Sequence, residues 1–247
     1  MKKNLLITRR QAIMTGMASL GALFLPGCSK PLPPTYGNIL RLGDLLTYGA
    51  QRTLLSGQSL AKEYHFQDIS SFPATGTVNP ADTSKPYFSE EYDQLRSGGF
   101  AEWSLSVEGC VSNPRRYSLK TLQQFPSRKQ ITRHTCEEGW TAIAEWTGVQ
   151  LGLVLENAGI LSNARYVNFY AYDGFTDSID MLDAFHPQTL LAYGMNGKDM
   201  PVPHGAPVRL RVEKQIGYKS MKYLKRIVVT ENFVESGDPG WAWYTGI

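Results

Sequence analysis

Several segments of the chain alternate apolar and polar residues with a period of two, and this pattern constrains the fold more than any other feature. It runs through residues 102–109 (EWSLSVEG), 206–213 (APVRLRVE) and 221–233 (MKYLKRIVVTENF). A strand is also predicted over residues 128–136 (RKQITRHTC). Successive side chains of a strand point to opposite faces, so this alternation is typical of half-buried strands. Residues 164–173 (ARYVNFYAYD) are predicted to form a further strand.

Helical signals are fewer and shorter. In residues 86–99, Ser89 is placed as an N-cap, acids fill the first turn and a Gly pair ends the segment. Further helices or helical turns are expected over residues 118–125, 149–159 and 183–197. Because helices and strands do not alternate regularly, the sequence predicts an α+β domain with a strand-rich mixed sheet, and not a doubly wound sheet.

The N-terminal segment resembles an export signal. Residues 1–27 have a basic start and a paired Arg9-Arg10 before a weakly apolar run that is short for a membrane span. This pattern favours a twin-arginine signal over an ordinary secretory signal or a retained anchor. The end of the run, LPGC, resembles a lipobox, so Cys28 is a candidate for lipid attachment. The protein is therefore expected in the periplasm, or anchored to a membrane and facing the periplasm.

Charge and composition divide the chain further. The leader holds four of the 25 basic residues and no acid, which leaves 21 basic against 22 acidic side chains. A nucleic-acid partner is therefore not expected. Residues 28–85 are rich in Pro, Ser, Thr and Gly and are predicted to form a tether followed by irregular loops, and residues 86–247 to form the domain.

Cys136 is the residue most suggestive of chemistry. It follows a predicted strand, in the stretch ITRHTCEEGW, and the neighbouring Arg133 would favour its thiolate, a soft ligand for a transition metal. Three alternatives are open. They are a disulfide with Cys110, a zinc site shared with His134, His186 or His204 although no zinc spacing is present, and a Cys-His hydrolase with His204 as its base.

Three blocks of sequence together carry a family resemblance. They are TRHTCEEGWTAIAEWTGVQL (residues 132–151), DAFHPQTLLAYGMNGKDMPVPHGAPVRLRV (183–212) and IGYKSMKYLKRI (216–227). In this order they resemble the molybdopterin domain of the sulfite oxidase superfamily, over about residues 102–233. They are most similar to its small exported bacterial members, which include the catalytic subunit of the periplasmic methionine-sulfoxide reductase.

The resemblance implies a sulfite oxidase-type molybdopterin-binding fold and a molybdenum ion held by the dithiolene of a molybdopterin. Cys136 would be the ligand of the metal, and Glu138 a carboxylate near it that handles a proton or orients a water. The pterin or its phosphate would be contacted by residues of HGAPVR and GYKSMK. These are His204, Arg209, Lys219, Ser220 and Lys222.

The implied activity is an exported oxidoreductase that moves an oxygen atom to or from a small substrate. Its electrons would be exchanged with a cytochrome or a membrane haem subunit, since the sequence has no haem or iron-sulfur motif. The alternatives are a non-catalytic exported lipoprotein that serves as a binding module, and the Cys-His hydrolase.

The sequence also departs from its relatives. An immunoglobulin-type dimerisation domain is not expected, and FPATGTVNP (residues 72–80) stands where an arginine-bearing loop would gather sulfite. Only DGFTDSIDMLD (173–183) stands where the methionine-sulfoxide reductase carries a long insertion. The sequence therefore predicts neither a particular substrate nor the direction of oxygen transfer.

Overall fold

The computed structural model describes residues 42–43, 46, 49–50, 53–54 and 59–233. The chain falls into two units, Met1–Gly43 and Asp44–Ile247, and the second holds all the strands given below. The predicted export signal and Cys28 lie outside the described residues. None of the helices in the described part is long and apolar enough to span a membrane.

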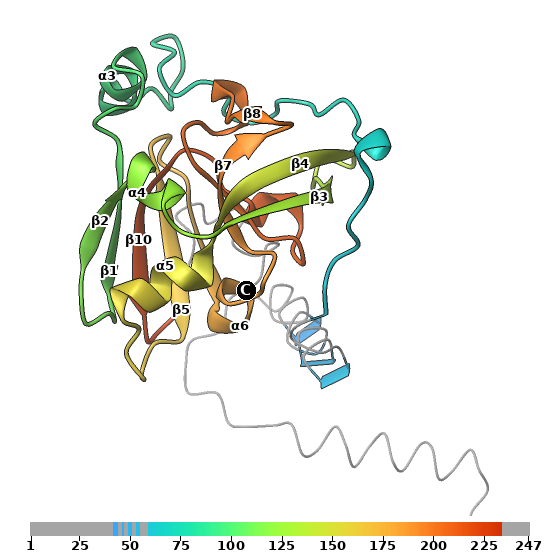
Figure 1. Ribbon diagram of the computed structural model, residues 1–247, viewed down its shortest axis with the longest axis vertical. Helices are drawn as coiled ribbons and strands as arrows, with labels where there is room; N and C mark the ends of the chain where they lie inside the picture. Colours follow the sequence, from blue (N-terminus) through green and yellow to red (C-terminus); the bar gives the residue numbers. More distant parts are fainter. Residues whose placement is uncertain (1–41, 44–45, 47–48, 51–52, 55–58, 234–247) are drawn as a thin grey trace, which may run out of the picture. The chain divides into compact units, whose positions relative to one another are not determined.

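The strands form two five-stranded sheets (Figure 1). The first has the order β2-β1-β10-β5-β6, and its strands are β1 (Ser104–Gly109), β2 (Arg115–Ser118), β5 (Tyr166–Ala171), β6 (Thr176–Asp180) and β10 (Leu224–Thr230). The second has the order β3-β4-β7-β8, with β9 also paired to β7. Its strands are β3 (Ser127–Thr135), β4 (Thr141–Gln150), β7 (Leu190–Met195), β8 (Lys198–Asp199) and β9 (Arg209–Arg211).

Only β1 and β10 are paired in parallel; the other strand pairs described are antiparallel. The sheets are therefore of mixed type, and the predicted strand-rich α+β class is confirmed. Figure 1 shows β3 and β4 as a long hairpin that leads away from the sheet of β1, β2 and β10.

Helices are short. Ser89 caps the helix Glu90–Ser97, as predicted, because its side chain accepts a hydrogen bond from the Tyr92 amide. Gly159, with a φ of 75°, ends the helix Leu151–Ala158. Within residues 59–233 the α-helices are α3 (Glu90–Ser97), α4 (Leu119–Gln123), α5 (Leu151–Ala158) and α6 (Met181–Ala184). The 3₁₀ turns are η1 (Phe66–Asp68), η2 (Val202–His204) and η3 (Gly217–Lys219).

The structure corrects two expectations about secondary structure. Residues 183–197 were expected to be a helix or a helical turn, but only the end of α6 is helical, Pro187 follows, and LLAYGM forms the buried strand β7. The strand β4 was not predicted. Most of its residues are buried on both faces, so its sequence does not alternate.

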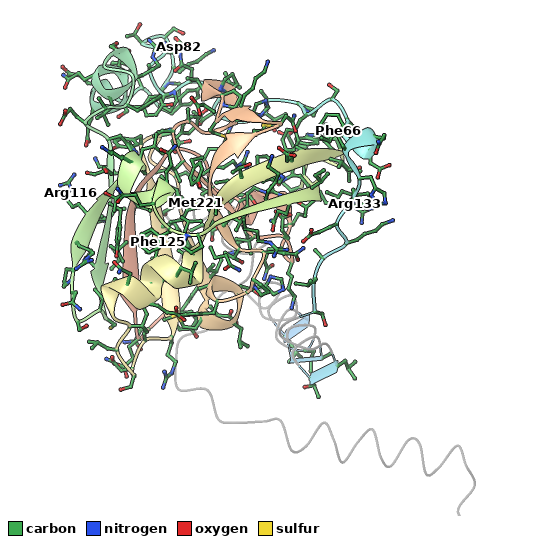
Figure 2. The ribbon with its side chains drawn as sticks, viewed as in Figure 1. Phe66, Asp82, Arg116, Phe125, Arg133 and Met221 are labelled. Atoms are coloured by element: carbon green, nitrogen blue, oxygen red, sulfur yellow. The ribbon has the colours of Figure 1, made fainter. Side chains whose placement is uncertain are left out.

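The core has two clusters of apolar side chains. The first packs against the sheet of β1, β5 and β10, where Leu105, Val107 and Ile227 are fully buried. Burial of each of these side chains contributes roughly 1.5–3 kcal/mol to the free energy of unfolding. The second surrounds Trp146 on β4. Figure 2 shows Met221 within the body of the molecule and Arg133 at its outer surface.

Residues 59–77 form no α-helix or strand, yet hydrogen bonds fix them against the second sheet. The Tyr64 amide donates to the Ile131 carbonyl (2.8 Å) and the Ser70 amide to the Ile143 carbonyl (3.0 Å). Gln188 also exchanges hydrogen bonds with both backbone groups of Ala61. This path carries the chain from β3 to the edge of the cavity described next.

Candidate active site

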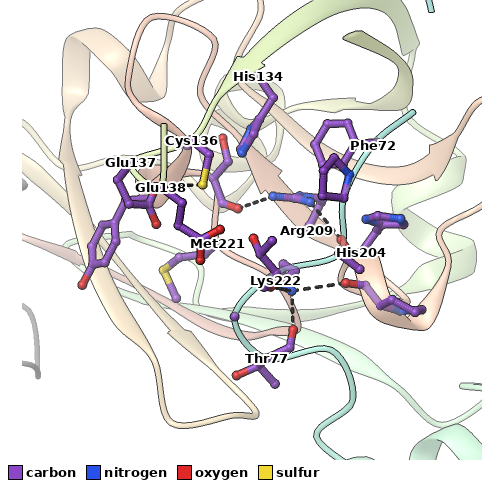
Figure 3. Close-up of a pocket in the computed structure, with 18 of the residues that line it drawn as sticks. Phe72, Thr77, His134, Cys136, Glu137, Glu138, His204, Arg209, Met221 and Lys222 are labelled. Atoms are coloured by element: carbon purple, nitrogen blue, oxygen red, sulfur yellow. Dashed lines mark hydrogen bonds between the residues drawn. The ribbon is translucent and has the colours of Figure 1, made fainter. Parts of the chain in front are cut away.

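A cavity of about 330 Å³ lies at the end of β3 (Figure 3). Five stretches of the chain line it: the loop before α3, the turn after β3, the turn after β5, the segment around η2 and the segment around η3. Its lining includes six of the seven predicted site residues, namely Cys136, Glu138, His204, Arg209, Ser220 and Lys222.

Cys136 begins the tight turn that follows β3. Its amide donates to the Trp140 carbonyl (2.9 Å), and its carbonyl accepts from the amide of Gly139, whose φ of 89° suits a glycine. The thiol is only 6% exposed, and its Sγ lies 3.5 Å from Oε2 of Glu137. Burial raises the pKa of Cys136, and the charges of Glu137 and Glu138 raise it further.

The expected effect of Arg133 on this thiol is wrong. Side chains alternate along β3, so His134 is buried while Arg133 is exposed (Figure 2). The thiol therefore stays protonated at neutral pH unless a cation binds it. A raised pKa is the opposite of what a hydrolytic cysteine needs.

The structure forms neither the disulfide nor a zinc site among the described residues. Cys110 and Cys136 are both free thiols, so the disulfide alternative is not formed. Within the described residues no group of three or more His, Cys, Asp and Glu side chains could hold a metal. His186 lies away from the cavity, with Nε2 3.1 Å from the Ser59 carbonyl oxygen.

Arg209 brings a buried positive charge to the cavity. Its two terminal nitrogens donate to the carbonyls of His204 (3.0 Å) and Ser220 (2.6 Å). Its Nε has no hydrogen-bond partner among the described residues, although it is buried. Burial, followed by repulsion from Arg211, lowers the pKa of Arg209 to about 9.

Two further basic side chains, His204 and Lys222, line the cavity near Arg209. Burial and the nearby Arg209 lower the pKa of His204 to about 4 and that of Lys222 to about 7. Within residues 59–233, neither Arg209 nor Lys222 forms an ion pair. The pKa values of Arg209, His204 and Lys222 all lie below their ordinary values. The part of the cavity that Arg209 and Lys222 line is therefore electrostatically suited to an anionic group.

Ser220 and Lys222 flank Arg209 differently. The Ser220 carbonyl accepts from Arg209, and its hydroxyl accepts from the Val212 amide (3.3 Å). Lys222 Nζ donates to the carbonyls of Thr75 (2.9 Å), Thr77 and Pro203 (3.2 Å). Figure 3 shows Lys222 and Arg209 side by side at the cavity.

Lys219, predicted to contact the cofactor, does not line the cavity. Its side chain is 1% exposed, and Nζ donates to Oδ1 of Asp177 (2.7 Å) and to the Ser178 carbonyl (3.0 Å). The short η3 turn points Lys219 into the β6 region, while Ser220 and Lys222 remain at the cavity.

Sequence reasoning did not predict that His134 lines the cavity. Its Nδ1 lies 2.6 Å from a terminal nitrogen of Arg211, which is always protonated, so Nδ1 accepts and Nε2 carries the proton. Burial and Arg211 lower the pKa of His134 far below its ordinary value. The ring lies so close to Gly217 that a Cβ there would approach Nε2 to 2.4 Å. The sequence of β3 carried no clear signal that His134 faces the cavity, because its buried positions, Gln130, Thr132 and His134, are all polar.

The loop of residues 72–77, which the sequence placed where relatives would gather sulfite, lies at the cavity. All six residues line the cavity, and Phe72 packs against four aromatic rings. These belong to His134, Trp140, Trp146 and His204, with ring centroids 5.2 to 5.6 Å away. The two carboxylates, Glu137 and Glu138, also line the cavity, and Glu138 accepts a hydrogen bond from the Trp140 indole (2.9 Å).

The chain matches the family described as oxidoreductase molybdopterin binding domain over residues 94–236, more than half of its length. The protein therefore belongs to this family, and its cofactor is molybdopterin with molybdenum. The family and the cofactor that the three sequence blocks predicted are confirmed. The buried Nε of Arg209, which lacks a partner, and the cavity-lining thiol of Cys136 fit an anionic cofactor that carries a soft metal.

Two relatives show how similar this chain is to individual proteins. YedZ1 of Azospira oryzae is 37% identical over 156 residues, which are 62% of this chain and 60% of YedZ1. The protein-methionine-sulfoxide reductase catalytic subunit MsrP of Xanthomonas axonopodis pv. citri is 29% identical over 244 residues, 92% of this chain and 71% of MsrP.

A solved structure shares the fold. The sulfane dehydrogenase SoxCD of Paracoccus pantotrophus superposes with a TM-score of 0.52 at 21% identity, covering 54% of this chain and 39% of the SoxCD chain. At this identity the likeness shows the fold alone. The chain spans three fifths of YedZ1 and less than half of SoxCD, so activity and substrate require separate arguments.

Proposed function

We propose that this protein is an exported reductase that removes the oxygen atom of a small, neutral methyl sulfoxide such as methionine sulfoxide. The observation that carries the proposal is that Cys136 and Arg209 line the same cavity. Cys136 is a soft metal ligand, Arg209 is a cation without a paired carboxylate, and the loop of residues 72–77 beside them carries no charge. Relatives named as methionine-sulfoxide reductase subunits support the choice of substrate.

The assigned site residues divide the work of holding the cofactor. Cys136 Sγ would bind the metal, giving up the proton that burial now keeps on it. Arg209, His204 and Ser220 would contact the pterin or its phosphate. When bound, molybdenum on its dithiolene supplies an acceptor for the oxygen atom and a store for two electrons.

The lining of the cavity favours a neutral sulfoxide over an anion such as sulfite. Glu137 and Glu138 would repel a negative substrate, and the loop of residues 72–77 presents only uncharged side chains. Aromatic rings around Phe72 offer favourable contacts to a sulfur atom and its methyl group.

The reaction consumes two electrons and two protons, and it releases the thioether and water. Glu138 is the carboxylate we assign to deliver or relay a proton, with its orientation set by the indole of Trp140. The electrons would come from a cytochrome or a membrane haem subunit. We place the enzyme in the periplasm after twin-arginine export, free or held by a lipid on Cys28.

The test is to purify the exported protein from a host that makes the cofactor. We expect molybdenum and pterin at about one per chain and reduction of methionine sulfoxide by a reduced viologen dye, with sulfite left unoxidised. Cys136→Ala should retain pterin and lose activity by about 10³-fold or more, because the protein's ligand to the metal is gone.

Two results would contradict the proposal. The first is wild-type protein that binds no molybdenum, which would favour a non-catalytic binding module. The second is labelling of Cys136 by an acyl-type covalent probe together with ester hydrolysis, which would favour a Cys-His hydrolase with His204 as its base.

A further inference from the structure

His134 lines the cavity from the end of β3, two residues before Cys136. Side chains two residues apart on a strand lie on the same face, so the imidazole of His134 and the thiol of Cys136 reach the cavity from the same side. Figure 3 shows both side chains at the cavity. The rings of Phe72 and Trp140 flank the imidazole, with centroids 5.2 and 5.4 Å from its own. The two nitrogens of this enclosed ring have different surroundings.

The Nδ1 side of the ring faces an ordered set of hydrogen bonds. Glu213 accepts from Nε (3.1 Å) and one terminal nitrogen (2.7 Å) of Arg211, and the other terminal nitrogen lies 2.6 Å from Nδ1 of His134. The buried Gln130 donates to the same carboxylate (3.0 Å). Guanidinium nitrogens only donate, so Nδ1 accepts and the hydrogen of the neutral ring is on Nε2. Glu213 and Arg211 therefore select one tautomer of His134.

Nε2 lies on the opposite side of the ring, toward the cavity. Its neighbour there is Gly217, which also lines the cavity, and a Cβ on this glycine would lie 2.4 Å from Nε2. Arg211, on the Nδ1 side, does not line the cavity. Within residues 59–233, Nε2 donates to no acceptor. An N–H that is shielded from water without an acceptor is destabilising, so this donor is arranged for an acceptor that a ligand brings.

We infer that His134 is a further residue that binds the cofactor, and that its Nε2–H donates a hydrogen bond to an acceptor atom of the molybdopterin group beside Cys136. Arg211 and Glu213 do not line the cavity and act through His134, as positioning residues that keep the hydrogen on Nε2.

This donor differs from the cations of the site. Arg209 and Lys222 supply positive charge for the anionic end of the cofactor. His134 adds an uncharged donor whose direction is fixed. The inference rests on the cofactor that the family establishes and not on the proposed substrate.

The first experiment determines the tautomer in the full-length protein, labelled with ¹⁵N-histidine, with and without the cofactor. The protonated and unprotonated nitrogens of a neutral imidazole differ widely in ¹⁵N chemical shift, and the signals missing from His134→Gln assign the ring. We expect the hydrogen on Nε2 in wild type. In the double variant Arg211→Met/Glu213→Gln, which removes both charges together, the form with the hydrogen on Nδ1 should become detectable.

The second experiment compares His134→Gln with His134→Asn in the full-length holoenzyme. The amide of Gln reaches the position of Nε2 and can still donate into the cavity. The amide of Asn reaches only the position of Nδ1, so it keeps an acceptor for Arg211 and loses the cavity donor. Arg133→Gln is the control, because Arg133 is the neighbouring residue on β3 and is exposed.

We expect His134→Asn to lose pterin during dialysis about tenfold faster than wild type or more, and His134→Gln to stay within about twofold, as should the control. A purely structural role in binding Arg211 predicts the reverse order. The order of the two variants therefore separates cofactor binding from support of the fold.

A wild-type ring that carries its hydrogen on Nδ1 would overturn the selection of the tautomer. Pterin that is held as firmly by His134→Asn as by wild type, or less firmly by His134→Gln than by His134→Asn, would overturn the cofactor contact. If the wild-type enzyme binds pterin but reduces no sulfoxide, the proposed substrate fails, and the tautomer and the pterin loss still decide the role of His134.

Discussion

Arg209 and Arg211 lie two residues apart on β9, are both buried, and both stack on the ring of Trp146, yet their charges are treated differently. Arg211 pairs with the buried carboxylate of Glu213 through two hydrogen bonds and also binds His134. Arg209 binds only backbone carbonyls and leaves its Nε without a partner among the described residues. The fold neutralises the cation that it uses as structure and leaves uncompensated the one that faces the cavity.

The two lysines near η3 show the same contrast. Lys219 is buried against Asp177, whereas Lys222 has only carbonyl acceptors. A paired carboxylate therefore distinguishes the structural cations, Arg211 and Lys219, from the cavity-lining cations, Arg209 and Lys222. Position in the sequence does not make this distinction. The predictions below test this separation.

The largest effect is expected at Glu213. Glu213→Gln would leave the charge of Arg211 buried without its counter-charge, so the free energy of unfolding should fall by about 3 kcal/mol or more. Urea unfolding of cofactor-free protein measures this, with the exposed Glu156→Gln as control. A loss below about 1 kcal/mol would mean that the pair is not structural.

A somewhat smaller loss is expected at Lys219. Lys219→Met strands the buried Asp177, whose pKa burial already raises, and should reduce the free energy of unfolding by roughly 2–3 kcal/mol. Molybdenum and pterin contents of the purified enzyme should not change, because Nζ does not reach the cavity. Loss of pterin at unchanged stability would restore the cofactor contact predicted from the sequence.

Arg209 should behave in the opposite way. Arg209→Met removes hydrogen bonds to two carbonyls but also relieves charge repulsion, so the cofactor-free protein should lose only about 1 kcal/mol. Pterin retention should fall about tenfold or more, because a charged donor to the cofactor is lost. Equal retention in the variant and wild type would remove the distinction between the two arginines.

The smallest effect concerns pH and His204. Its pKa in the folded protein is about 4, below its ordinary value of 6.5. Between these pH values the unfolded chain binds a proton that the folded chain does not, so stability falls as the pH drops through this window. Because the ring is partly exposed, His204→Gln should flatten this dependence by only about 1 kcal/mol.

Much of the architecture could be predicted because alternation reports half-buried strands directly. Segments 102–109 and 221–233 each contain an observed strand, and the Ser89 cap marked α3 correctly. Prediction failed where burial is two-sided: β4 and β7 carry apolar residues on both faces, so neither has a period that distinguishes it from a helix.

The site was predictable only in part. The family resemblance named residues that do gather at the cavity, such as Cys136 and Arg209, because their blocks are specific. It could not separate Lys219 from Lys222, since the direction of a side chain on a short 3₁₀ turn depends on tertiary contacts. Phe72 and Asp173 carried no local signal, because their contacts join segments far apart in the chain.

The position of β10 has a consequence for biosynthesis. It is the middle strand of the first sheet, between β1 and β5, yet it is the last strand of that sheet to be synthesised. Until residues 224–230 leave the ribosome, β1 and β5 have no common neighbour, and the lysine beside β10 cannot reach the loop it holds. The nascent chain thus has to wait for nearly its whole domain before its hydrophobic centre closes, a topology expected to fold slowly because its contacts are distant in sequence.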